Sequence, residues 1–371
     1  MKKSGKPLKI LISGGGSGGH VFPAIAIANA LKKKDPAAEF LFVGAKGKIE
    51  MEKVPKAGFE IKGLWISGFH RKQPLRNLLF PLKLLNSLWN AWRILQRFRP
   101  DVVVGVGGFA SGPVLEVASR MGIPTLIQEQ NSYAGMTNKL LAKKVDKICV
   151  SYEGMERFFP KEKLVMTGNP VRDDLTAAIS REDAAAYFGM DPKQKILFVF
   201  GGSLGAQSIN EALAANAELI AATPEIQILW QMGNIYGPRF ENCATAQLPN
   251  VQARLFVDRM DLAYAMADLT VSRAGAMTIS ELSLLGQPAI LIPSPNVAED
   301  HQTPNAKAIM KQEAGIWLPD SEAKEKIIRK AKEVLEDEAL LKKLSENILK
   351  LAVPDAADRI AAEVLELARS E

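Results

Sequence analysis

The sequence has little cysteine and no long apolar run. Cys149 and Cys243 are its two cysteines, too few for a disulfide framework, and neither has a second Cys or a His nearby at metal-site spacing. This usage predicts a reducing, cytoplasmic compartment. No stretch approaches the ~18 apolar residues of a spanning helix, and the apolar run behind the basic N-terminus is too short for a signal peptide. Disulfide-rich secreted and membrane-spanning classes are therefore excluded.

Acidic residues are scarce in the first part of the chain. Residues 1–100 hold 19 Lys and Arg against 5 Asp and Glu, a net charge of +14 against +6 for all 371 residues. The remainder of the chain is therefore net acidic. Such asymmetry predicts that the first half faces an anionic partner, and we expect a lipid surface rather than nucleic acid.

Residues 61–100 contain no acid at all and mix basic with aromatic and aliphatic residues, including three of the five tryptophans. This mixture is typical of a surface that lies on anionic lipid. The alternative is an amphipathic core helix with a solvated basic face. We favour the lipid surface because acids are wholly absent. The residues expected at the membrane are Trp65, Phe69, Arg71, Lys72, Arg76, Phe80, Lys83 and Trp89.

A strand predicted over 8–12 runs into a glycine-rich turn, 14–19, and then a helix. The glycines satisfy G-x-G-x-x-G, which can mark a dinucleotide site. The next predicted strand ends on Gly44, where an NAD-binding fold requires an acid for the ribose. We therefore favour a loop whose backbone N–H groups approach a diphosphate. His20 stands at its exit.

A second strand, turn and helix is predicted over 269–286. Gly275 follows a short apolar run, and Thr278 with Glu281 has the spacing of a capping box that opens a helix. The N–H groups of such a helix start can bind a phosphate. A carboxylate in the same turn would repel it, so Glu281 either pairs with a ribose diol or only completes the cap.

The same order of elements recurs in both halves of the chain. Residues 101–127 match 268–292, and the loop at 14–19 has a counterpart at 201–206. This repetition predicts an α/β fold of two Rossmann-like domains facing across a cleft, joined through 160–174. The expected domains are an acceptor- and membrane-binding domain over 1–165, a donor-binding domain over 166–353, and a final helix over 354–371 that packs back on the first domain.

Several blocks together resemble the GT-B glycosyltransferases, most closely family 28, the bacterial undecaprenyldiphospho-muramoylpentapeptide β-N-acetylglucosaminyltransferases. They follow the family's order and span nearly the whole chain, which makes the resemblance specific where one Gly-rich loop would not be. The blocks are 15–23, 107–113, 129–139, 168–172, 201–206 and 272–305.

The resemblance implies a set of site residues. Phe109, where the family often has Tyr, and Gln128, where many members have His, depart from its pattern on the acceptor side. The acceptor diphosphate is expected at Gly15, Gly16, Gly107 and Gly108. The residues implied for UDP-GlcNAc, the donor, are Ser17, Gly18, Gly19, Asn131, Arg172, Ser203, Val257, Ala276, Met277, Thr278, Ile279, Ser280, Glu281, Gln302 and Asn305.

The implied reaction transfers GlcNAc from UDP-GlcNAc to the 4-hydroxyl of the muramoyl sugar of lipid I, with inversion, at the cytoplasmic face of the cell membrane. It requires a base for the hydroxyl and stabilisation of the departing diphosphate. Arg172 and the helix start after Gly275 can supply the latter, and without an Asp-x-Asp motif we expect neither metal nor cofactor. His20, whose imidazole suits proton abstraction near neutral pH, and Glu129 are the candidate bases. The alternative for His20 is a structural hydrogen bond to the loop or the acceptor.

Three other functions compete with this one. A UDP-GlcNAc 2-epimerase shares the fold and the donor but has no use for a basic aromatic membrane patch. An NAD-linked oxidoreductase is opposed by Gly44. A non-catalytic lipid-surface protein leaves the nucleotide signature unexplained.

Overall fold

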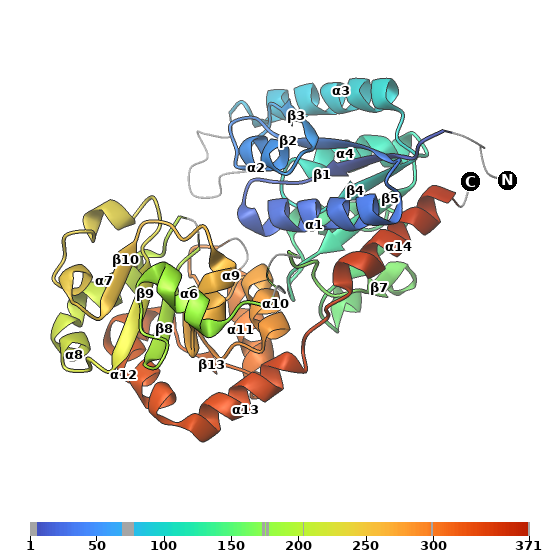
Figure 1. Ribbon diagram of the computed structural model, residues 1–371. Helices are drawn as coiled ribbons and strands as arrows, with labels where there is room; N and C mark the ends of the chain where they lie inside the picture. The colour runs from blue at the N-terminus through green and yellow to red at the C-terminus, as the bar shows by residue number, and fades with distance from the viewer. Residues whose placement is uncertain are drawn as a thin grey trace. The chain divides into compact units, whose positions relative to one another are not determined.

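The computed structural model describes residues 6–68, 78–172, 175, 178–202, 204–297 and 300–369. The chain forms two compact units. The N-unit comprises Met1–Arg172 and Val353–Glu371, and the C-unit comprises Asp173–Ala352. Each unit is a parallel sheet with helices on both faces (Figure 1).

The N-unit sheet has the strand order β3-β2-β1-β4-β5-β6-β7, and every pair is parallel. The order reverses between β1 and β4, so the loops after these two strands meet at the carboxyl edge, where such sheets bind ligands. The strands are β1 Lys9–Ser13, β2 Glu39–Ala45, β3 Glu60–Leu64, β4 Val102–Gly105, β5 Thr125–Glu129, β6 Lys147–Val150 and β7 Leu164–Met166. The helices are α1 Gly18–Lys34, α2 Glu50–Lys56, α3 Phe80–Phe98, α4 Ser111–Arg120, α5 Met136–Leu141 and α14 Ala356–Arg369, with short 3₁₀ turns at Met155–Arg157 and Lys161–Lys163.

The two faces of the N-unit sheet have separate cores because side chains alternate along each strand. Ile10 and Ile12 pack with α1 and α14, whereas Leu11 packs with α3 and α4. Figure 1 shows α14, in red, beside α1. The chain thus leaves the N-unit after Arg172 and returns to it at Val353.

Part of the predicted linker belongs to the N-unit sheet. Within 160–174, Leu164–Met166 forms strand β7 and pairs in parallel with β6. A strand of three residues is too short to show an alternating pattern, so it could not be recognised by periodicity.

The C-unit sheet has the order β10-β9-β8-β11-β12-β13, which reverses between β8 and β11. The strands are β8 Lys195–Phe200, β9 Ile226–Gln231, β10 Val251–Arg254, β11 Leu269–Ser272, β12 Ala289–Leu291 and β13 Ile316–Trp317. The helices are α6 Arg181–Phe188, α7 Gln207–Ala215, α8 Ala217–Ala221, α9 Met260–Met266, α10 Ala276–Leu285, α11 Gln302–Lys311, α12 Ala323–Glu336 and α13 Glu338–Leu349, with 3₁₀ turns at Gly237–Arg239, Thr245–Gln247 and Asp320–Glu322.

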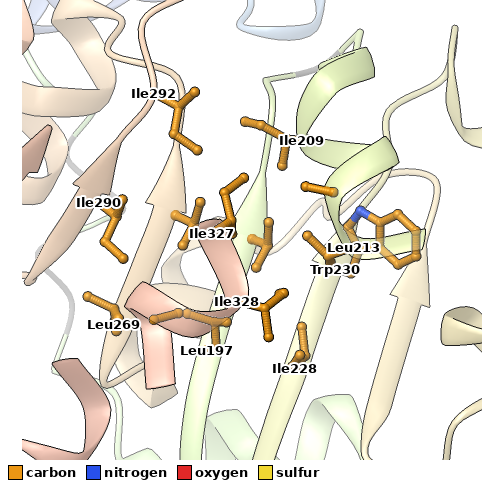
Figure 2. Packing of buried hydrophobic residues seen from close by; sticks show 14 of the residues in the cluster. Leu197, Ile209, Leu213, Ile228, Trp230, Leu269, Ile290, Ile292, Ile327 and Ile328 are labelled. Carbon is orange, nitrogen blue, oxygen red and sulfur yellow. The ribbon is translucent and has the colours of Figure 1, made fainter. Parts of the chain in front are cut away.

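One face of the C-unit sheet packs against α7 and α12, as Figure 2 shows for Leu197, Ile209 and Ile327. Trp230 is fully buried there, and its indole N–H donates to Asn210 Oδ1 at 3.0 Å, so the polar atom is not left unpaired. The six strands of this sheet follow the order of the first six strands of the N-unit sheet, which has β7 in addition. The prediction of an α/β protein with two Rossmann-like domains is confirmed.

Candidate functional site

In the N-unit, the loops after β1 and β4 touch one another through glycines. Gly15 and Gly16 have φ values of 144° and 92°, and Gly107 and Gly108 have 88° and 79°, all positive. A Cβ on Gly108 would lie 2.2 Å from the Gly15 carbonyl oxygen, so only glycine allows this approach. The four predicted acceptor residues therefore lie together at the switch point of the sheet.

The start of α1 completes this edge of the N-unit. The carbonyl of Ser17 accepts the N–H groups of His20 and Val21, so the N–H groups of Gly18 and Gly19 precede the first intrahelical bond and can face an anion. Arg172 lies in the same unit, with its guanidinium 5.5 Å from the Phe22 ring of α1.

His20 is held in one orientation by the loop after β4. Its Nδ1 lies 2.9 Å from the carbonyl oxygen of Val106, which can only accept, so Nδ1 carries a proton. In the neutral ring the lone pair is then on Nε2. A Cβ on Gly107 would come within 2.9 Å of the imidazole, so the glycine makes room for it. This tautomer can accept a proton at Nε2.

Glu129 anchors its own loop. It is 1% exposed; Oε1 accepts from the backbone and side-chain N–H groups of Asn131, and Oε2 from Gly135 N–H and Asn138 Nδ2, at 2.9 to 3.2 Å. Both carboxylate oxygens are thus occupied by hydrogen bonds within the loop. The geometry favours loop organisation for Glu129.

The two departures from the family pattern differ in position. Gln128 is fully buried and donates from Nε2 to Asn169 Oδ1 at 3.0 Å, so it supports the loop from beneath. The Phe109 ring would lie 2.9 Å from a Cβ on Gly16, so it borders the acceptor loop.

In the C-unit, α10 begins earlier than predicted. Gly275 is its N-cap, and its carbonyl accepts the first helical bond from Ile279 N–H. The predicted capping box of Thr278 and Glu281 is wrong because both residues lie inside the helix, and Gly275, which has no side chain, leaves the first turn uncapped. Glu281 stands in the second turn, where its Oε2 accepts the Tyr264 hydroxyl at 3.2 Å. The carboxylate is thus held by Tyr264, beyond the first-turn N–H groups of the helix.

The predicted donor residues of α10 differ in what they can offer. Ala276 and Ile279 bury their side chains, so only their backbone can meet a ligand. Ser280 turns its hydroxyl back onto the Ala276 carbonyl at 3.0 Å. Met277 and Thr278 are half-buried.

Gln302 and Asn305 lie on α11. Gln302 Oε1 accepts the Ser294 N–H at 2.8 Å, which fixes the amide and leaves its nitrogen as the group able to donate to a ligand. Asn305 is fully buried and donates from Nδ2 to the Ala274 carbonyl at 3.3 Å. Asn305 thus supports the loop before α10 rather than facing solvent.

Gln231, at the end of β9, was not predicted. Its Nε2 donates to the Gly202 carbonyl at 3.1 Å, and its Oε1 accepts the Val257 N–H at 2.9 Å. It thereby joins two predicted donor segments. Ser203 lies outside the described residues. The signal that could have found Gln231 is its place as a polar residue at the end of the apolar strand β9.

Arg273 was also not predicted, although it lies within the block 272–305 that resembles the family. Its guanidinium donates to the carbonyls of Ile292 and Pro293 at 3.2 Å and to Ser208 Oγ at 2.8 Å, and it forms an ion pair with Asp320. One side chain thus fixes the ends of β11 and β12 and the start of α7.

The helix α3 exposes several large apolar side chains and buries Leu95 together with two small residues. Ser87 and Ala91 face the sheet, whereas Leu82, Leu85, Trp89 and Trp92 are 58%, 64%, 58% and 40% exposed. Their spacing of three and four residues forms one stripe. The solvated face therefore carries an apolar stripe beside the exposed Arg93 and Arg97, whereas the core-helix alternative expects a basic face alone.

Other predicted membrane residues lie near this stripe. Trp65 is 46% exposed, and Lys83 Nζ lies 5.7 Å from its ring centre. Phe80 and Lys83 are half-buried. Phe69, Arg71, Lys72 and Arg76 lie outside the described residues. In the part of the chain that the structure describes, no helix is long and apolar enough to cross a bilayer.

Two family models match most of the chain: the glycosyltransferase family 28 N-terminal domain over 10–150 and its C-terminal domain over 196–360. A protein of Bacteroides fragilis, 52% identical over 98% of this chain and 97% of its own length, is named UDP-N-acetylglucosamine--N-acetylmuramyl-(pentapeptide) pyrophosphoryl-undecaprenol N-acetylglucosamine transferase. A Flavobacterium psychrophilum protein of that name is 50% identical, over 98% of both chains. The crystal structure of Acinetobacter baumannii MurG has a TM-score of 0.74 at 27% identity and covers 97% of this chain and 100% of its own.

Proposed function

The chain belongs to glycosyltransferase family 28 and is a glycosyltransferase, and we propose that it transfers GlcNAc from UDP-GlcNAc to lipid I, giving lipid II for peptidoglycan synthesis. The observation that carries this proposal is the match, at about half identity and over nearly the whole chain, to enzymes named for that transfer. The family assignment and the fold agree with it.

We assign the donor to the C-unit. The uncapped N–H groups at the start of α10 suit its diphosphate. Glu281, away from that start, is then able to accept a hydrogen bond from the ribose diol. Gln302, fixed through its oxygen, is able to donate to a sugar hydroxyl. Gln231 and Arg273 hold the neighbouring loops in place through hydrogen bonds to the carbonyls of Gly202 and Pro293.

We assign the acceptor to the N-unit. His20 Nε2 takes the proton of the attacking 4-hydroxyl as the new glycosidic bond forms and the bond from the sugar to the UDP oxygen breaks. The negative charge that develops on the departing diphosphate is stabilised by the N–H groups at the start of α10 and by the Arg172 guanidinium. We assign the stripe on α3 to contact with anionic lipid at the inner surface of the membrane, and the exposure of its apolar side chains supports this assignment.

The assay that tests this function follows UDP release. The protein should release UDP from UDP-GlcNAc only when a lipid I analogue is present, with a disaccharide product. UDP release or epimerised sugar without the acceptor would indicate the epimerase. Oxidation of NADH would indicate an oxidoreductase, and no turnover with either substrate would indicate a binding protein.

Replacing Glu281 with alanine is expected to weaken UDP-GlcNAc binding by about 10- to 100-fold, since a hydrogen bond to a charged group contributes about 1.5–3 kcal/mol. Binding is measured by calorimetry and Tm by scanning. Tyr264→Phe, the matched control, removes the same internal hydrogen bond but keeps the carboxylate, and should bind nearly as the parent does. A large fall in Tm with unchanged affinity would show that Glu281 is structural.

Replacing Gln302 with alanine is expected to reduce the preference for UDP-GlcNAc over UDP-GalNAc by about tenfold, because a donor aimed at one hydroxyl rejects the epimer that misplaces it. The ratio of kcat/KM for the two donors measures this. Thr303→Ala, which removes the neighbouring hydroxyl that donates to Asp300, is the control and should keep the preference. If Gln302→Ala keeps it too, another residue recognises the sugar.

A further inference from the structure

Glu50, the first residue of α2, carries a carboxylate buried beneath the glycine-rich loop of the N-unit. The side chain is 1% exposed. Its Oε2 accepts the N–H of Gly16 and its Oε1 accepts the N–H of Ala45, each at 2.9 Å. A buried carboxylate is stable only when such partners replace water, and here each oxygen has one. Glu50 therefore ties the loop after β1 to the end of β2.

The glycines around Glu50 are shaped by it. A Cβ on Gly15 would lie 2.2 Å from Oε1, and a Cβ on Gly44 would lie 2.5 Å from Cγ. Gly15, which the sequence suggested for a phosphate, and Gly44, at the end of β2, thus make room for a side chain of the protein. The N–H of Gly16 is occupied by the carboxylate, so it is not a donor for a ligand.

The carboxylate of Glu50 differs in its orientation from the acidic residue of a dinucleotide-binding fold. Dinucleotide-binding folds place an acidic residue at the end of the second strand, where it faces the ribose. Here that strand end carries Gly44 and Ala45, and the acid of α2 turns inward onto backbone N–H groups. The carboxylate nearest this strand end is therefore bound to backbone N–H groups of the protein itself.

We propose that Glu50 is a positioning residue for the acceptor, because it fixes the Gly15–Gly16 turn in its positive-φ shape. This inference rests on the proposed function. The diphosphate of the lipid acceptor then meets a turn already fixed in shape, together with the N–H groups of Gly18 and Gly19, without using Gly16.

The test compares Glu50→Ala and Glu50→Gln with the parent. The alanine variant should raise the KM for a lipid I analogue at least tenfold and leave the KM for UDP-GlcNAc unchanged. The glutamine variant keeps one of the two N–H bonds and should show a smaller rise. Glu52→Ala is the matched control on the same helix, since its carboxylate is exposed and pairs with Lys53 and Lys56. It should match the parent in both KM values.

Two results would overturn the inference. Unchanged KM values in both Glu50 variants, whatever the change in Tm, would reduce Glu50 to a packing residue. A parallel rise in both KM values would indicate general damage. If the alanine variant does not fold, the glutamine variant decides, because its KM for the lipid I analogue should rise while its KM for UDP-GlcNAc stays unchanged. Failure of the proposed function is distinguishable, because the parent itself would then release no UDP with lipid I.

Discussion

A variant with serine at Leu82, Leu85, Trp89 and Trp92 is expected to stay in the supernatant under conditions in which the parent chain sediments with anionic vesicles. Each large apolar side chain contributes about 1.5–3 kcal/mol when fully removed from water. Losing four of them from one stripe therefore removes most of the salt-insensitive binding. Folding should be little affected, because these side chains are already exposed. Vesicle sedimentation at two salt concentrations measures the effect.

The control replaces Met310 and Leu349, exposed apolar residues of the C-unit, with serine and should leave vesicle binding unchanged. Charge reversal at Arg71, Lys72, Arg76 and Lys83 should remove the salt-sensitive part, about 1 kcal/mol for each charge near the surface. Both membrane variants should turn over a short-chain, water-soluble acceptor at nearly the parent rate. A variant that still sediments, or that loses activity on the soluble acceptor, would contradict the membrane role of α3.

Replacing His20 with alanine is expected to lower kcat by about 10²- to 10⁴-fold, the usual contribution of a general base. The KM for UDP-GlcNAc should change little, since the imidazole is assigned to the acceptor hydroxyl. Steady-state kinetics with a soluble acceptor would measure both quantities. This expectation follows from the Nδ1 bond to the Val106 carbonyl, which leaves Nε2 to take the proton.

Asparagine at position 20 separates the base from the structural alternative. Its side-chain N–H can take the place of Nδ1 and keep the bond to the Val106 carbonyl, but the amide cannot accept a proton near neutral pH. His20→Asn should therefore be as inactive as His20→Ala. Recovery of activity in the asparagine variant would show that His20 only supports the loop.

Much of the fold was predictable because its signals are local. Both halves repeat a short apolar run, a glycine turn and a helix. This repetition predicted the two Rossmann-like domains, which the two parallel sheets confirm. The turn at Gly275 was found for the same reason. The start of α10 was predicted too late, because the spacing of Thr278 and Glu281 imitates a capping box inside the helix.

The supporting residues were not predictable, because each acts across a long stretch of sequence. Glu50 binds a loop 34 residues earlier, Gln231 binds a backbone N–H 26 residues later, and Arg273 pairs with a carboxylate 47 residues later. No local pattern marks such partners. Only the parallel sheet order, which brings distant strand ends to one edge, makes them neighbours.

The return of the chain to the N-unit through α14 bears on how the protein is made. The C-unit is inserted within the N-unit, so the ribosome completes every residue of the C-unit before it reaches Val353. Until α14 emerges, the apolar face of α1 that meets Ile360 and Val364 lacks its cover. At about 5–20 residues per second, the second unit has its full sequence first. The first unit, although begun earlier, receives the last of its sequence only after the second unit is complete.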